Sequence, residues 1–420
     1  MNVSSATIKR NLKTNRPGAI VLGGNFVGLG VARSLGVHGI PVWIIDHDKS
    51  RAMARWSRYT KRFIWSKDKI EDLLLSEGRQ NGLDGWVIFP VTDEYVEAVS
   101  KNHQSLSTIY RLTTPPQDIT QFALDKRLTY RKAAELDIAV PRRFSLTTAN
   151  DANDFSYPVI LKPAVNHHFF PSANVKALRA NGVMEFHRQY AQMRAVIPAE
   201  EILVQELIPG GGENQFSFGA MCIDGCVCAT IVAQRRRQYP IEFGNASTFV
   251  ETTDHPVVEE FGRRFLQGIG FDGIAEVEFK VDPRDGSCKI LDVNTRPWGW
   301  HTLGKAAGVD FPYLLWRQKI GDDIPKMVRP RRAAWFREMT DFVAIAKSKH
   351  PVAEMRRLLQ AVLRGDLTAA AFDILDPIPF FAEFALWIRT GLARQRRASN
   401  FLGNLDATAM SPEDAAANSE

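Results

Sequence analysis

The stretch IAEVEFKVDPRDGSCKILDVNTRP, residues 274–297, predicts a β-hairpin with acidic side chains facing one another. Two runs of alternating polarity, Ala275 to Val281 and Cys288 to Thr295, flank a turn with proline and glycine, Asp282 to Ser287. Pairing the strands about this turn sets Glu278 opposite Asp292. Because side chains alternate between faces, one face is expected to carry Glu276, Glu278, Lys280, Ile290, Asp292, Asn294 and Arg296, and the other, a core face, Ala275, Val277, Phe279, Leu291 and Val293.

The facing carboxylates predict a cation. Directly opposed residues of a hairpin lie about 5 Å apart, and like charges there are destabilising. A cation between Glu278 and Asp292 would remove this repulsion. Ligand sets made only of oxygen suit magnesium that carries nucleotide phosphates, with manganese as the alternative ion.

The order of these residues resembles a known signature. Glu278 followed by Asp292-x-Asn294-x-Arg296 is similar to the metal and phosphate motif of the ATP-grasp superfamily, which includes D-alanine:D-alanine ligase, carbamoyl phosphate synthetase and biotin carboxylase. The resemblance implies that Glu278, Asp292 and Asn294 hold magnesium and that Arg296 contacts the transferring phosphate. The middle position is usually Glu in the family, so the shorter Asp292 is expected to weaken metal binding without abolishing it.

Two lysines extend the resemblance to the nucleotide. The segment 122–144, FALDKRLTYRKAAELDIAVPRRF, predicts a helix that starts at Asp125-Lys126 and ends before Pro141. It resembles the segment that opens the family's nucleotide-binding domain, which implies that Lys126 approaches phosphate; a solvated surface lysine is the alternative. Lys162 ends the apolar strand 157–163 and matches the family lysine that reaches the α-phosphate and adenine.

The strand and turn from Glu201 to Gly210 resemble the family's hinge. The resemblance implies that the backbone of Glu206, Leu207 and Ile208 binds adenine and that Glu213 binds the ribose hydroxyls. Eight positions then follow the family's order, and together they are more specific than any one of them: Lys126, Lys162, Glu206, Glu213, Glu278, Asp292, Asn294 and Arg296.

The segment 164–174, AVNHHFFPSAN, departs from the family because it contains no glycine. At this place the family carries a glycine-rich flap over the nucleotide. The segment is expected to be a loop, stiffer and bulkier than the usual lid. His167 and His168 either contact phosphate or are ordinary exposed loop histidines.

Residues 17–115 predict a small parallel α/β domain. A strand, a glycine turn, a helix and a second strand ending at Asp46 form a βαβ unit, with further strands at 62–65 and 86–90. The glycines run G-G-x-x-x-G-x-G, so the G-x-G-x-x-G spacing of NAD-binding proteins is missing. The resemblance implies a pre-ATP-grasp domain that shapes the substrate site, and an NAD-linked enzyme is the alternative.

Substrate contacts are expected from the arginines at 235–237. Their alternation along an extended segment places Arg235 and Arg237 on one face, as candidates for contacts to a substrate carboxylate or the γ-phosphate, and Arg236 towards solvent. Trp298 and Trp300 follow the metal ligands and either wall the acceptor site or belong to the core.

Composition limits the class of protein. With 420 residues, 45% of them hydrophobic and 24% charged, the chain is typical of a soluble globular protein with two or three domains. Four cysteines are too few for a disulfide scaffold, and no signal peptide is recognisable, so a cytoplasmic location is expected. Zinc binding by Cys222, Cys226 and Cys228 is a weak alternative to a hairpin that turns at Asp224-Gly225.

The C-terminal part carries the positive charge. Residues 329–397 contain 13 Lys plus Arg against 7 Asp plus Glu, an excess of 6 that equals the net charge of the chain. Helical periodicity at 333–346, 352–363 and 380–392 predicts a basic helical region over 326–400. The apolar segment 378–388 is too short to span a bilayer. It packs on the main body, lies on a membrane together with residues up to 397, or joins subunits of a homodimer.

Together these features predict an α/β (α+β) protein with a pre-ATP-grasp domain (17–115), an ATP-grasp domain (116–325), a C-terminal helical region (326–400) and disordered tails at 1–16 and 401–420. The resemblance implies a ligase that uses ATP and magnesium to phosphorylate a carboxylate and to couple it to an amine, with amino-acid-like or peptide-like substrates and without nucleic acid. A catalytically decayed nucleotide-binding protein is a further alternative.

Overall fold

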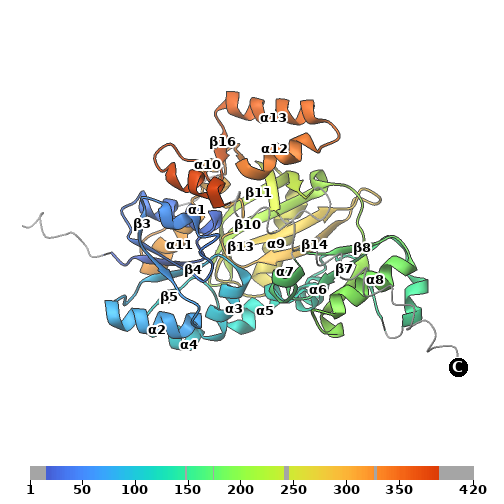
Figure 1. Ribbon diagram of the computed structural model, residues 1–420, viewed down its shortest axis with the longest axis horizontal. Helices are drawn as coiled ribbons and strands as arrows, with labels where there is room; N and C mark the ends of the chain where they lie inside the picture. The colour runs from blue at the N-terminus through green and yellow to red at the C-terminus, as the bar shows by residue number, and fades with distance from the viewer. Residues whose placement is uncertain (1–15, 147–148, 174, 241–245, 326–328, 387–420) are drawn as a thin grey trace, which may run out of the picture.

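The computed structural model describes residues 16–146, 149–173, 175–240, 246–325 and 329–386 and contains three sheets (Figure 1). Residues 1–15 of the predicted N-terminal tail (1–16) and the whole predicted tail 401–420 therefore lie outside the described residues. The first sheet has the strand order β3-β2-β1-β4-β5, and all of its pairs are parallel. Its strands are β1 Ala19–Leu22, β2 Val42–Asp46, β3 Thr60–Trp65, β4 Val87–Pro90 and β5 Arg111–Leu112, and its helices are α1 Phe26–Gly36, α2 Ile70–Asn81, α3 Asp93–Lys101 and α4 His103–Leu106.

Two further sheets form the middle of the chain. The smaller sheet has the order β6-β9-β7-β8, and the larger has the order β14-β13-β10-β11-β12-β15-β16. Their strands are β6 Arg143–Phe144, β7 Val159–Pro163, β8 Leu178–Ala180, β9 Ile202–Glu206, β10 Gln215–Ile223, β11 Cys226–Tyr239, β12 Ala246–Thr252, β13 Gly273–Val281, β14 Cys288–Asn294, β15 Ala334–Phe336 and β16 Leu367–Ala369.

The helices of this part lie around the two sheets, and α12 and α13 stand apart from them at the top of Figure 1. They are α5 Gln117–Leu124, α6 Lys126–Glu135, α7 Asn166–Ala173, α8 Val183–Arg194, α9 Pro256–Gly268, α10 Thr302–Ala307, α11 Phe311–Ile320, α12 Glu338–Ala346 and α13 Pro351–Arg364, with the short 3-10 helices η3 Ala149–Asp154, η4 Ala199–Glu201 and η5 Gly212–Asn214. A further 3-10 helix, η2 Met53–Trp56, lies between β2 and β3 in the first domain.

The N-terminal βαβ unit is confirmed. Gly23 forms the turn after β1 at a φ of +109°, a conformation that glycine adopts without steric cost. Asp46, at the end of β2, accepts hydrogen bonds from the backbone N–H groups of Gly24 (2.6 Å) and Asp48 (2.9 Å). The carboxylate that a dinucleotide-binding protein would present to a ribose is therefore buried and engaged by the protein itself.

The hairpin is also confirmed, with one correction. β13 pairs with β14 so that Glu278 lies opposite Asp292 and Glu276 opposite Asn294. A bulge between Glu278 and Phe279 then shifts the register, and Phe279 pairs with Ile290. The prediction that Ile290 shares the acidic face was wrong, because the extra residue, Leu291, takes the place on the cleft side while Ile290 is fully buried in the core.

The C-terminal region is more than a helical appendage. The predicted helix 333–346 was wrong at its start: Ala334–Phe336 forms β15, which pairs antiparallel with β12, and the helix begins only at Glu338. β16 adds a further, parallel strand to β15. The predicted helix at 352–363 is confirmed as α13. Residues 378–386 are helical, and the rest of the predicted 380–392 helix lies outside the described residues.

One hydrophobic core joins the first sheet, the large sheet and the C-terminal strands, since Val21, Trp298 and Trp335 all belong to it. A separate core lies under the small sheet, around Phe169 and Phe186. The four cysteines are unpaired, and Asp224-Gly225 forms the predicted two-residue turn between β10 and β11. Nowhere in the described ranges do the cysteines take part in a group that could hold a metal.

Candidate active site

A cleft of about 1430 Å³ lies where the three sheets and the C-terminal helices meet. Its walls include residues of the first domain, such as Asp93, and of the hinge, such as Leu207. The hairpin contributes Glu276, Glu278, Asp292 and Asn294, and the region between α12 and α13 contributes residues 347–350. The cleft therefore brings together the predicted metal, phosphate and adenine positions.

The acidic face of the hairpin lies in this cleft. The Asn294 amide donates to Glu276 (Nδ2 to Oε2, 2.9 Å) and to Glu278 (Nδ2 to Oε1, 3.2 Å), and the Trp300 indole donates to Glu276 (Nε1 to Oε1, 2.8 Å). Burial and then the nearby Glu278 carboxylate raise the pKa of Glu276 to about 7. The raised pKa therefore reflects first the burial of the Glu276 carboxyl group and second its closeness to Glu278.

These residues fit a magnesium ion. Glu278 and Asp292 face one another across the hairpin, and Asn294 adds an amide oxygen on the same face. All three offer oxygen atoms, and hard divalent cations prefer such ligands. Trp298 is core, whereas Trp300 is buried but also lines the cleft beside Glu276.

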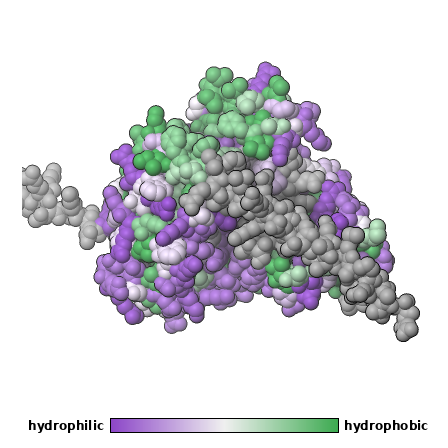
Figure 2. Space-filling view, viewed as in Figure 1, coloured by the Kyte–Doolittle hydropathy of each residue, from purple (hydrophilic) through white to green (hydrophobic). Residues whose placement is uncertain are grey.

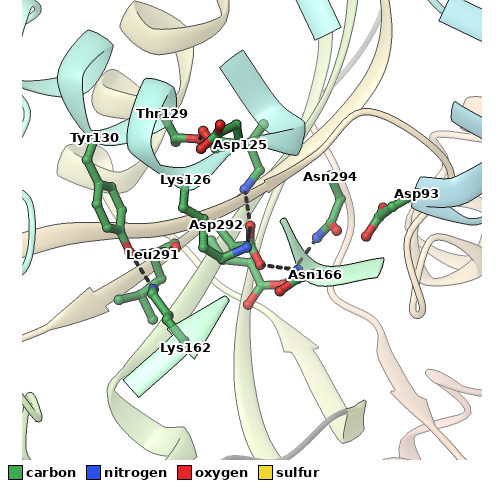
Figure 3. A network of polar contacts seen from close by, with 12 residues as sticks. Asp93, Asp125, Lys126, Thr129, Tyr130, Lys162, Asn166, Leu291, Asp292 and Asn294 are labelled. Carbon is green, nitrogen blue, oxygen red and sulfur yellow. Dashed lines mark hydrogen bonds and ion pairs between the residues drawn. The ribbon is translucent and has the colours of Figure 1, made fainter. Parts of the chain in front are cut away.

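Two lysines approach the same carboxylates (Figure 3). Lys126, just after the N-cap Asp125 of α6, is buried and forms an ion pair with Asp292 (Nζ to Oδ1, 2.8 Å), so it is not a solvated surface lysine. Lys162 donates to the Tyr130 hydroxyl. Burial and then the charge of Lys126 lower the pKa of Lys162 to about 7. A buried, poorly compensated ammonium group is a strong site for an anion such as phosphate.

Arg296 is held between the first domain and the hairpin. Its guanidinium donates to Asp93 on α3 (Nε to Oδ1, 2.6 Å) and to Asn294 (Nη2 to Oδ1, 3.1 Å). Arg296 lines the cleft within reach of the carboxylates. The first domain thus helps to orient the arginine that the motif implies for phosphate contact.

The hinge is fixed from below by Lys280, which donates to the carbonyl groups of Ile208 and Gly210 (2.8 Å each). The Glu206 side chain accepts hydrogen bonds from Lys289 and Arg284. Because its carboxylate is engaged in this way, only the backbone of Glu206 is available to bind adenine. Leu207, Ile208 and Glu213 line the cleft, and Glu213 accepts from the Gly211 N–H (3.0 Å).

The three arginines of β11 differ from the predicted alternation. Bulges between 235 and 237 and between 237 and 238 interrupt it. Arg235 pairs with Glu278 (3.1 Å), and Arg236 pairs with Glu251 (3.0 Å) and does not simply face solvent. Arg237 is buried, and its guanidinium is bound by Asp341 and Glu354 of α12 and α13 (2.6 and 2.7 Å). Of the predicted pair, Arg235 is therefore the one that lies beside Glu278, a predicted metal ligand.

The glycine-free segment does not form the predicted loop. Residues 166–173 form α7, and its first residue, Asn166, donates to Asp292 (Nδ2 to Oδ2, 3.3 Å). His167 pairs with Glu97 of α3 (3.0 Å), and His168 pairs with Glu201 (2.8 Å). Figure 3 shows Asn166 and Lys126 pointing at the same carboxylate.

Several residues of the site were missed by the sequence analysis. Glu276 was expected only as a neighbour on the acidic face, and its burial was not foreseen. Tyr130 and Asn166 carry no motif of their own, although both come from segments that were singled out. Asp93 follows Thr92 at the start of a helix, which reads as an ordinary N-terminus. Its role depends on a contact across 203 residues of sequence.

Comparisons with known proteins bear out the resemblance. D-aspartate ligase of Enterococcus faecium is 22% identical over 228 residues, which cover 50% of this chain and 53% of that protein. The carbamoyl phosphate synthase large chain of Thermoanaerobacter pseudethanolicus is 21% identical over 312 residues, 69% of this chain and 27% of that one. The chain thus spans about half the length, or less, of these relatives. No family model matches the chain.

Solved structures support the same fold. Biotin carboxylase of Campylobacter jejuni matches with a TM-score of 0.59 and 14% identity, over 73% of this chain and 72% of that one. L-amino acid ligase of Bacillus licheniformis matches with a TM-score of 0.57 and 16% identity, over 76% of this chain and 80% of that one.

Proposed function

From the ATP-grasp fold of this chain, we propose that it is an ATP-dependent ligase that joins a carboxylate to an amine and releases ADP and phosphate. The observation that carries the proposal is the hairpin register, which sets Glu278 opposite Asp292 with Asn294 alongside, in a cleft that also holds Lys126 and Lys162. D-aspartate ligase and L-amino acid ligase, to which the chain is similar, are by name ligases that act on amino acids.

Each part of the nucleotide has a proposed partner. The hinge backbone at Leu207 and Ile208 would bind adenine, and Glu213 would bind the ribose hydroxyls. Lys126 and Lys162 would contact the phosphates, since both are cations that line the cleft, Lys126 buried and Lys162 partly buried. Glu278, Asp292 and Asn294 would hold magnesium, which neutralises charge on transferring phosphates when it is bound.

The proposed reaction has two steps. A substrate carboxylate oxygen attacks the γ-phosphorus of ATP, the bond from that phosphorus to the β,γ-bridging oxygen breaks, and ADP leaves. The amine nitrogen then attacks the acyl carbon, the bond to the phosphate oxygen breaks, and the amine gives up a proton. Arg296 and Arg235 would orient and neutralise the charged oxygens, because both guanidinium groups lie beside the metal ligands.

We propose amino-acid-like or peptide-like substrates. The cleft extends beyond the hairpin to residues 347–350, between α12 and α13, and this part carries Lys347, Lys349 and His350. A basic wall at the far end of the cleft suits a substrate with a second anionic group. The names of the two ligases above agree with this class.

The test is ADP release from ATP and magnesium in the presence of paired amino acids and dipeptides. We expect release to require a carboxylate and to be stimulated by an amine, and hydroxylamine to trap the acyl group as a hydroxamate. Asp292→Asn should abolish release, whereas Asp285→Asn in the exposed hairpin turn should not. If ATP binds but no pair of carboxylate and amine substrates causes ADP release, the alternative of a catalytically decayed nucleotide-binding protein is favoured. The reason to consider this alternative is that the glycine-free segment forms a helix.

A contact with an anionic membrane is also proposed. No helix in the described part of the chain is long and apolar enough to cross a membrane. However, Val352 and Leu363 of α13 and Ile374 after β16 are each more than 80% exposed, and apolar residues gather over these segments (Figure 2). Within α13 itself, Arg356, Arg357 and Arg364 stand against one acidic residue, Glu354. Apolar side chains flanked by cations are typical of surfaces that lie on anionic lipid.

This arrangement is compatible with the cytoplasmic location that we propose on the unpaired cysteines. A homodimer would bury the same apolar surface, and it remains the competing explanation.

A further inference from the structure

Helix α7 is called the lid here, because its first residues, Asn166 and His167, line the cleft. It carries two adjacent histidines near a carboxylate of the first domain. Glu97 of α3, His167 and His168 each offer a ligand atom, and these atoms all lie within 4.8 Å of one another. The Nε2 atom of His167 is 3.0 Å from Oε2 of Glu97. We propose that these three residues form a second metal site, separate from the magnesium carboxylates, for a zinc-class divalent ion.

The choice of ion follows from the ligands. Two imidazoles and one carboxylate suit Zn²⁺, Co²⁺ or Ni²⁺ and leave a coordination position for water. Magnesium takes oxygen ligands and keeps several waters, so it is a poor match. The two sites would therefore be selective for different ions in the same protein.

The surroundings of the histidines support the site. The Nδ1 atom of His168 lies 2.8 Å from Oε2 of Glu201. A histidine that donates its Nδ1–H to a carboxylate keeps a lone pair on Nε2, and metal-binding histidines are commonly oriented in this way. The Nδ1 atom of His167 is buried without a hydrogen-bond partner among the described residues, so no protein group there fixes the tautomer of this ring.

The proposed second metal site lies next to the proposed magnesium ligands. Asn166, the residue before His167, donates to Asp292, and Glu97 lies one helical turn after Asp93, which holds Arg296. A bound ion would therefore fix the start of the lid to α3, directly beside the proposed magnesium ligands. We infer a metal-dependent latch that holds α7 over the cleft.

Cobalt is the probe for the test, since its absorption spectrum reports nitrogen ligands. The full chain is stripped with EDTA, and Co²⁺ is added in the presence of excess Mg²⁺. We expect one Co²⁺ per chain with the intense bands of a low-coordinate site. His167→Ala and Glu97→Gln should remove these bands, and Glu201→Gln should weaken binding by about 10–100-fold. His187→Ala, an exposed histidine of α8, is the matched control and should bind as the wild type does.

A second readout concerns the lid. Amide hydrogen exchange in α7 should slow when Co²⁺ binds to the wild type and not when it is added to His167→Ala. The proposal is overturned if wild type and His167→Ala bind Co²⁺ alike, or if the wild type binds none. It is equally overturned if Asp292→Asn abolishes the bands, because the ion would then be at the hairpin. Each variant is compared by its unfolding midpoint without metal, so that a folding defect is recognised.

Discussion

Lys162 lies partly buried beside the Tyr130 hydroxyl, and its lowered pKa of about 7 means that a bound anion can change its protonation state. The sequence indicated this lysine because a cation ended an apolar strand. It gave no sign of Tyr130 as the partner, since that contact joins α6 to β7. Identity of the charged residues was thus predictable, whereas their pairing depends on packing between elements.

We predict that binding of ADP without magnesium takes up a proton through Lys162. Its pKa is about 7 in the free protein and should rise next to a phosphate. Below pH 7 the lysine is already protonated, so uptake is small; above pH 7 binding must protonate it, and ADP affinity falls as pH rises. Calorimetry at pH 8 in two buffers with different ionisation enthalpies measures the uptake. Lys162→Met should lose it, and Lys132→Met, at a partly exposed position outside the cleft, should keep it. Equal uptake in both variants would contradict the assignment.

Arg237 is predicted to be a structural residue. Asp341, its main partner, is fully buried, so Arg237→Met would leave a buried carboxylate without a counterion. Such a loss destabilises a protein by about 3–5 kcal/mol. Urea unfolding at pH 7 measures it, and Arg263→Met, which removes an exposed pair with Glu259, should cost less than about 1 kcal/mol. If Arg237→Met is as stable as the wild type but has a raised KM for the carboxylate substrate, Arg237 contacts the substrate and is not a structural residue.

At the scale of elements, the hairpin shows what alternation can and cannot predict. The pairing of Glu278 with Asp292 followed from the turn. The bulge at Leu291 could not be predicted in this way. A single inserted residue is not visible in an alternating sequence pattern, and only burial in the folded protein shows which side chain belongs to the core. β15 was read as the start of a helix for a similar reason. Three apolar residues fit either period, and the exposed hydrogen-bonding edge of β12 decides between them.

Lys280 of β13 holds the backbone of the hinge in position. We predict that Lys280→Met raises the Kd for ADP about tenfold, because the carbonyl groups of Ile208 and Gly210 lose their donor and the hinge loosens. Lys289→Met is the matched control, since Arg284 contacts the same carboxylates, Glu206 and Asp282, and can replace it. Calorimetric titration with ADP compares them. An unchanged Kd in folded Lys280→Met would show that the hinge is held by other contacts.

At the scale of the molecule, the site is assembled from parts far apart in the chain. Asp93 reaches it from the first domain, and residues 347–350 reach it from the C-terminal helices. The order of motifs predicted the ATP-grasp resemblance and the α/β fold class. It could not predict these two contributions, which follow from how the sheets and helices pack around one cleft.

The exposed apolar surface gives a prediction for the whole molecule. The chain should float with vesicles that contain anionic lipid and remain free of neutral ones, and added salt should weaken the binding. Replacing Val352 and Leu363 with Ser should reduce flotation, whereas replacing the exposed Met184 of α8 should not. Light scattering distinguishes the competing explanation: a dimer that dissociates in the Val352/Leu363 variant, with no vesicle binding by the wild type, would assign the surface to self-association.

The account depends most on the facing carboxylates Glu278 and Asp292 as a magnesium site for ATP. The direct measurement is calorimetric titration with ATP, with and without Mg²⁺, of the wild type and of Asp292→Asn. We predict that Mg²⁺ strengthens ATP binding to the wild type and that this gain disappears in Asp292→Asn, while the variant still unfolds in a cooperative thermal transition. ATP binding to the wild type that is indifferent to Mg²⁺, or absent, would contradict the account.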